Sequence, residues 1–122
     1  MVAHILVIEN EERVSEAICD HLADQGYRCT SATTLEEARL VLSRFQIDLL
    51  IVGSELPGGA DGLELAREAR ASGLPAMMIA PSSSAPIAGE GIPVLVKPLR
   101  LDRLLEAIEV LIDPSARSPK TA

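Results

Sequence analysis

Short segments suited to strands and longer segments suited to helices alternate along this chain. Five segments of five to seven residues have the length of strands, and four of them are apolar apart from at most one residue, as in strands buried on both faces of a sheet. The five segments are Val2–Ile8, Tyr27–Ala32, Ile47–Val52, Pro75–Ile79 and Ile92–Val96.

Between most of these segments, apolar residues recur at the spacing of an amphipathic helix. The four sets are Val14, Ala17, Ile18 and Leu22; Leu35, Ala38, Leu42 and Phe45, as an inward stripe; Leu63, Leu65, Ala66 and Ala69; and Leu101, Leu104, Leu105, Ile108 and Leu111. Gly26 and Gly73 stand where glycine commonly ends a helix. Thr34 and Glu37 have the spacing of a capping box, and Asp61 is suited to cap the third helix.

Alternating strands and helices predict an α/β fold with a parallel sheet and helices on both faces. Residues 1–112 are expected to form one domain, and residues 113–122, which include two prolines, a flexible C-terminal tail. One segment breaks the alternation. Pro81–Gly91 contains two prolines, two glycines and three serines without a helical stripe, so the fourth helix is expected to be reduced or absent.

The composition of the chain argues against several classes of function. The net charge of −7, from 18 acidic and 11 basic residues, disfavours nucleic acid and anionic membranes, and the aromatic residues are only Tyr27 and Phe45. No segment approaches the roughly 20 apolar residues needed to span a bilayer. Cys19 and Cys29 lack metal-ligand spacing and are interpreted as two small apolar residues in a reducing setting. We therefore expect a soluble cytoplasmic protein.

The carboxyl ends of the predicted strands carry the residues most relevant to function. Ligands bind at this edge of a parallel sheet, and here it presents Glu9, Asn10, Gly53, Ala80 and Lys97. No glycine-rich phosphate loop follows the first strand. The acidic residues nearby match no metal motif, so no metal or cofactor is expected. Among the histidines, His4 is expected in the core or at a sheet edge and His21 in solvent, and neither suggests nucleophilic catalysis.

Three fragments give the chain a family resemblance. Ile5–Glu12, Asp48–Gly62 and Leu95–Leu99 together resemble the receiver domain of bacterial two-component response regulators, over residues 2–112. Their order and spacing make the match specific. The resemblance implies a flavodoxin-like three-layer sandwich with a five-stranded parallel sheet of order 2-1-3-4-5.

The same resemblance implies a phosphorylation pocket that has degenerated. In the family, an aspartate that ends the third strand takes a phosphoryl group from a histidine kinase, an acidic pair helps to bind Mg²⁺, a Thr or Ser reads the phosphoryl group, and a Lys-Pro contacts it. At these positions the chain has Gly53, the pair Glu9 and Asn10, Ala80, and Lys97. Val94 stands where the family has an aromatic residue.

We therefore expect a pseudo-receiver without enzymatic activity that acts as a phosphorylation-independent protein interaction module. Its partner is expected to be a signalling protein, or a second copy bound through the face of strand four, strand five and the family's helix five. The alternatives are a structural remnant of a larger regulator and an effector-binding domain that uses the emptied pocket.

Two side chains in the pocket leave open alternatives. Lys97 either forms an ion pair with Glu9 or is solvated, with the Lys97–Pro98 step kept for its turn geometry and a cis bond as in the family. Glu55 is either solvated or swings over the vacated site as a built-in negative charge.

Overall fold

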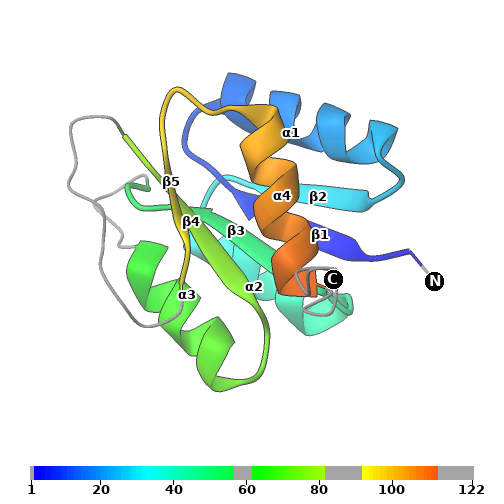
Figure 1. Cartoon of the computed structure of the whole chain (residues 1–122). Coiled ribbons are helices and arrows are strands. Elements are labelled where there is room, and N and C mark those ends of the chain that lie inside the picture. The colour runs from blue at the N-terminus through cyan, green and yellow to red at the C-terminus, as the bar shows by residue number, and fades with distance from the viewer. Residues whose placement is uncertain (1, 57–61, 82–91, 113–122) are drawn as a thin grey trace.

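A computed structural model of the chain describes residues 2–56, 62–81 and 92–112, and it contains a five-stranded parallel sheet between two layers of helices (Figure 1). The strand order is β2-β1-β3-β4-β5, as expected for a flavodoxin-like sandwich. The strands are β1 (His4–Ile8), β2 (Arg28–Ala32), β3 (Leu49–Gly53), β4 (Ala76–Ala80) and β5 (Val94–Val96). The helices are α1 (Glu12–Asp24), α2 (Leu35–Arg44), α3 (Gly62–Ala71) and α4 (Leu101–Ile112).

The five predicted strands and four predicted helices are all found, with their ends shifted by up to a few residues. Three predictions fall outside the described residues. They are the capping role of Asp61, the reduced or missing helix within Pro81–Gly91, and the tail of residues 113–122. None of the described helices combines the length and apolar character needed to cross a bilayer.

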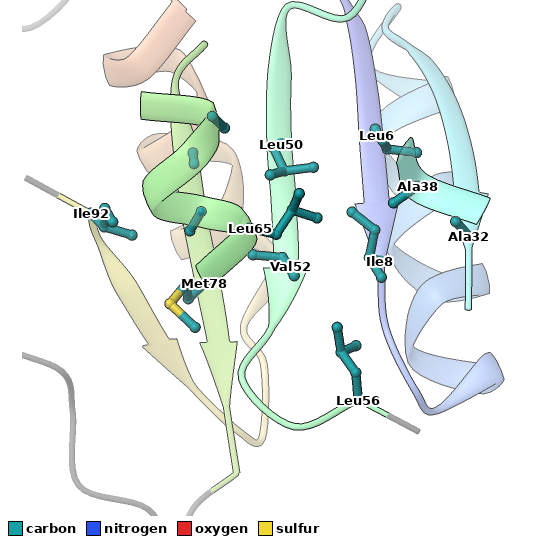
Figure 2. Close-up of a cluster of buried hydrophobic side chains, with 13 residues drawn as sticks. Leu6, Ile8, Ala32, Ala38, Leu50, Val52, Leu56, Leu65, Met78 and Ile92 are labelled. Carbon is teal, nitrogen blue, oxygen red and sulfur yellow. The ribbon is translucent and has the colours of Figure 1, made fainter. Parts of the chain in front are cut away.

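Two hydrophobic clusters hold the helices to the sheet. Strands β1, β3 and β4 are buried at every position, and successive side chains alternate between the two faces. On one face, α2 and α3 pack on Leu6, Ile8, Leu50, Val52 and Met78, with Leu65 of α3 lying against the sheet (Figure 2). On the other face, α1 and α4 pack on Ile5, Val7, Leu49, Ile51, Met77 and Ile79.

Helix ends follow the predicted signals with one variation. Gly26 and Gly73 adopt φ values of 92° and 88°, in the left-handed region that glycine tolerates best. Thr34 Oγ1 accepts a hydrogen bond of 3.1 Å from the Glu37 N–H, as in a capping box. The Glu37 carboxylate, however, accepts from the backbone and hydroxyl of Thr33, at 2.7 and 2.9 Å.

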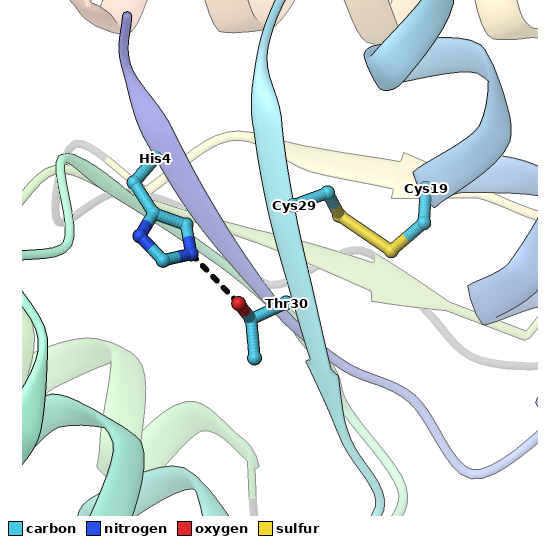
Figure 3. Close-up of a disulfide and its surroundings, with 4 residues drawn as sticks. All are labelled: His4, Cys19, Cys29 and Thr30. Atoms are coloured by element: carbon cyan, nitrogen blue, oxygen red, sulfur yellow. Dashed lines mark hydrogen bonds between the residues drawn. A yellow bond between two sulfur atoms is a disulfide. The ribbon is translucent and has the colours of Figure 1, made fainter.

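Three side-chain predictions were wrong. Phe45 was expected on the inward stripe of α2, but it is 50% exposed, because α2 ends at Arg44 and Phe45 lies outside the helix in an extended backbone conformation. His21 is only partly exposed, and its Nε2 is buried without a hydrogen-bond partner among the described residues. Cys19 and Cys29 are not separate thiols, because the packing of α1 on β2 joins them in a disulfide (Figure 3).

His4 lies in the core, as expected. It is 6% exposed, its Nε2 is hydrogen-bonded to Thr30 Oγ1 at 2.7 Å (Figure 3), and its ring meets that of Phe45 edge-on. Burial, and then the positive charge of Arg28, lower the pKa of His4 below its ordinary value of 6.5, against a smaller opposing effect of Asp48.

The lowered pKa of His4 predicts acid sensitivity. Because the unfolded chain binds the proton more readily, the stability contributed by neutral His4 is present above pH 6.5 and is lost as the pH falls below it. Urea unfolding at pH values of about 7.5 and about 5.5 should therefore show a larger loss in the wild type than in His4→Gln. Equal losses in the two proteins would contradict this role.

Candidate functional site

All five predicted site residues lie at the carboxyl edge of the sheet. Glu9 directly follows β1, Gly53 ends β3, Ala80 ends β4 and Lys97 directly follows β5. The ladder aligns these ends, since Ile8 pairs with Val52, Gly53 with Ile79 and Ala80 with Val96. The fifth residue, Asn10, is exposed beside Glu9.

An open pocket of about 330 Å³ lies at this edge. Charged and polar side chains from several loops surround it, while the Ala80 side chain is buried and is not part of the lining. The lining residues are Glu9, Asn10, Glu11, Gly53, Ser54, Glu55, Ile79, Pro81 and Lys97.

Glu9 is a buried carboxylate with two partners. The residue is 2% exposed, and its Oε2 accepts hydrogen bonds from the Glu11 N–H at 2.8 Å and from Lys97 Nζ at 3.2 Å. A charge taken out of water is costly unless it is paired and hydrogen-bonded. These contacts therefore compensate the negative charge of Glu9 where it lies.

Lys97 binds two carboxylates. Its side chain is 23% exposed and its Nζ contacts both Glu9 and Glu11. Burial lowers the pKa of Lys97, but hydrogen bonds and opposite charges from Glu11 and Glu9 outweigh it and raise the pKa above its ordinary value of 10.5. The structure thus contains the ion pair rather than the solvated lysine, and the Lys97–Pro98 bond is cis.

Gly53 is buried with backbone and side-chain atoms close around it. A Cβ added there would lie 3.1 Å from Glu9 Oε1, so the Glu9 carboxylate borders the space where a side chain would begin. On the helix side, Gly62 of α3 approaches so closely that a Cβ on it would lie 1.9 Å from the Gly53 carbonyl oxygen. The end of β3 is therefore enclosed by Glu9 and by the start of α3.

The other residues discussed for this site contribute less to its polar contacts. Ala80 is 1% exposed and carries no hydroxyl group, and Val94 is half-buried and paired with Met78. Glu55 is exposed at the pocket, in agreement with the solvated alternative. Within the described ranges, no three His, Cys, Asp or Glu side chains are arranged to hold a metal ion.

Two polar residues of the pocket, Glu11 and Ser54, were not among the predicted site residues. Glu11 lies at the N-cap of α1 and contacts Lys97, and its position two residues after Glu9 was the only available signal. Ser54 follows Gly53 and lines the pocket, and its Oγ is buried without a hydrogen-bond partner among the described residues. Nothing in the sequence pattern marks this serine.

The chain is similar to known proteins in both sequence and structure. Residues 5–109 match the model of the response regulator receiver domain. The aerobic respiration control protein ArcA of Escherichia coli K12 is 36% identical over 75 residues, which are 62% of this chain and 31% of ArcA. The curated relatives are thus matched over less than a third of their own length.

Two solved structures have the same fold. NtrX from Brucella abortus matches with a TM-score of 0.83 and 25% identity, over 95% of this chain and 28% of NtrX. SdrG from Sphingomonas melonis Fr1 matches with a TM-score of 0.78 and 24% identity, over 91% of this chain and 97% of SdrG. The family model covers residues 5–109, which are most of the chain, so the chain belongs to the response regulator receiver domain family.

Proposed function

We propose that this receiver domain acts in two-component signal transduction as a protein interaction module that is independent of phosphorylation. The observation that carries the proposal is Gly53 at the end of β3, beside a Glu9 carboxylate already paired with Lys97. Glycine has no side chain that could accept a phosphoryl group. Ala80 likewise has no hydroxyl group with which to read one.

The pocket does not fit the magnesium ion that the family implies. Mg²⁺ requires several oxygen ligands in near-octahedral geometry and is usually held by carboxylates. Here Asn10 is neutral, Gly53 offers no side chain, and Oε2 of Glu9 is occupied by Lys97 Nζ and the Glu11 N–H. These residues therefore do not supply the metal site that phosphoryl transfer requires in the family.

The cation that contacts the phosphoryl group in the family has different partners here. Lys97 is held by Glu9 and Glu11, so two carboxylates surround the ammonium group without any phosphorylation. The positive charge is thus satisfied within the chain. We infer a domain that rests in a single state and signals by being bound.

We further propose where the protein works and which of its surfaces binds a partner. The interaction domain spans residues 1–112, and the protein works in the cytoplasm without enzymatic activity or an obligatory cofactor. The partner, a signalling protein or a second copy, binds the face of β4, β5 and α4. Val96, on edge strand β5, is 39% exposed and offers apolar surface there.

A second candidate is binding of a small effector in the pocket. The open volume of about 330 Å³ favours it, as does Ser54 Oγ beside that pocket, which is buried and has no hydrogen-bond partner in the part of the chain that the structure describes. Such an effector would replace phosphorylation as the signal.

Acetyl phosphate tests the loss of phosphorylation. Wild-type protein treated with acetyl phosphate and Mg²⁺ should show no added phosphoryl mass by intact-protein mass spectrometry, because no acceptor carboxylate ends β3. Ser54→Ala is the matched control for the neighbouring hydroxyl group. A stable adduct on the wild type would overturn the proposal, and its persistence in Ser54→Ala would exclude Ser54 as the acceptor.

A partner assay tests the positive half of the proposal. Wild-type protein should capture the same partner with and without acetyl phosphate, and Val96→Asp should capture less because it places a charge on the exposed edge of β5. Capture that depends on acetyl phosphate would contradict the claim.

A further inference from the structure

The Cys19–Cys29 disulfide joins α1 to β2. The two Cα atoms are 5.5 Å apart, within the range that a disulfide spans. Both residues are partly exposed, at the border of the core cluster that contains Ile18 and Leu22. The bond is neither sealed in the core nor far out on a loop.

Its location makes the bond accessible to small molecules. β2 is an edge strand that pairs with β1 alone, and none of its first four residues is fully buried. A thiolate or a small disulfide in solution can therefore approach Cys29 from the open edge of the sheet. Access of this kind distinguishes exchangeable disulfides from permanently buried ones.

We propose that Cys19 and Cys29 form a reversible redox pair. The proposal rests on the cytoplasmic setting of the proposed function, where disulfides are rare and are mostly transient or redox-sensing. The oxidant is a low-molecular-weight disulfide. One cysteine thiolate attacks it, forms a mixed disulfide and releases one thiol.

The second cysteine thiolate then attacks the protein sulfur of that mixed disulfide and releases a second thiol. In total, the two protein thiols lose two protons and two electrons, and the oxidant gains both. An excess of a reduced thiol reverses the sequence. No metal or further reactant is needed.

The bond acts on the helix that borders the pocket. α1 begins directly after Glu11, which holds Lys97, and the same helix presents Val14 and Ile18 to an apolar hollow of about 340 Å³ that Lys97 and Leu99 also line. Fixing α1 to β2 restrains both of these surfaces. The oxidised and reduced forms thus differ in how firmly α1 is held.

Thermal unfolding measures this restraint. Reduction should lower the Tm of the wild type by on the order of 10 °C, since the bond closes a loop between residues ten apart in sequence and so restricts the unfolded chain. The Tm of the double variant Cys19→Ser/Cys29→Ser should not respond to the reductant. Equal Tm values for oxidised and reduced wild type would overturn the restraint.

Glutathione buffers test reversibility on the wild type, so the result does not depend on any variant folding. Alkylation and mass spectrometry across mixtures from mostly oxidised to mostly reduced glutathione should show a two-electron transition between dithiol and disulfide. Protein that stays oxidised in reduced glutathione, or stays reduced in glutathione disulfide, would overturn the redox pair. The acetyl phosphate experiment involves neither cysteine, so failure of this inference can be told apart from failure of the proposed function.

Discussion

Replacing Gly62 with alanine is expected to lower the free energy of unfolding by about 3 kcal/mol. An added Cβ would lie 1.9 Å from the Gly53 carbonyl oxygen, 2.9 Å from its carbonyl carbon and 3.1 Å from Val52 Cγ2. Two of these three atoms belong to the backbone of β3, which is buried and paired on both sides. The strain must therefore shift α3 away from the sheet.

Chemical denaturation of the wild type and Gly62→Ala gives the difference directly. Gly26→Ala is the matched control. Its Cβ would meet nothing within 4 Å, so only the cost of a φ of 92° remains, about 1 kcal/mol. If Gly62→Ala proved no less stable than Gly26→Ala, the close approach of α3 to Gly53 would be refuted.

Replacing Lys97 with methionine is the second large effect, with an expected loss of about 2 kcal/mol. Methionine retains an unbranched apolar side chain but removes the cation, which leaves the 2% exposed Glu9 carboxylate with only its backbone hydrogen bond. The cost stays below that of a fully buried pair because the Lys97 side chain is 23% exposed.

A double-mutant cycle isolates the pair. Glu9→Gln combined with Lys97→Met should recover part of the loss, since it removes the uncompensated charge. Arg100→Met is the surface control, because Arg100 and Asp102 are 68% and 64% exposed and their ion pair contributes little. A loss in Lys97→Met no larger than in Arg100→Met would argue against a structural role for the Glu9 pair.

The Glu9–Lys97 pair should also make the stability of the folded protein depend on pH in the alkaline range. Because the pKa of Lys97 is raised in the folded state, its contribution to stability is complete below pH 10.5 and is lost as the pH rises through the folded pKa. Lys97→Met should lack that alkaline loss of stability.

Much of this fold was accessible from sequence because strand and helix periods are local properties. Nearly continuous apolar runs predicted β1, β3 and β4, and helical stripes predicted all four described helices. Parallel strands align their carboxyl ends, so the sequence alone places Glu9, Gly53 and Lys97 close together. The Glu9–Lys97 contact follows from that alignment.

Other contacts depend on how the helices pack on the sheet, which the hydrophobic periodicity of the sequence does not specify. The disulfide of Cys19 and Cys29 requires a particular rotation of α1 on β2. The ion pair of Lys97 with Glu11 requires the start of α1 to lie next to the end of β5. The close approach of Gly62 to Gly53 depends on how deeply α3 sits on the sheet.

Residue types and their order were enough to establish the parallel sheet, the family, and the glycine where the family has an aspartate. Only the tertiary structure determines how the altered site is arranged. Glu9 is buried there, and Lys97 and the Glu11 N–H compensate its charge. The tertiary structure also joins α1 to the edge strand β2 through the disulfide. The physical reason is that period and composition act along the chain. Charge compensation and covalent pairing act across a few ångströms of space, between residues that the fold alone brings together.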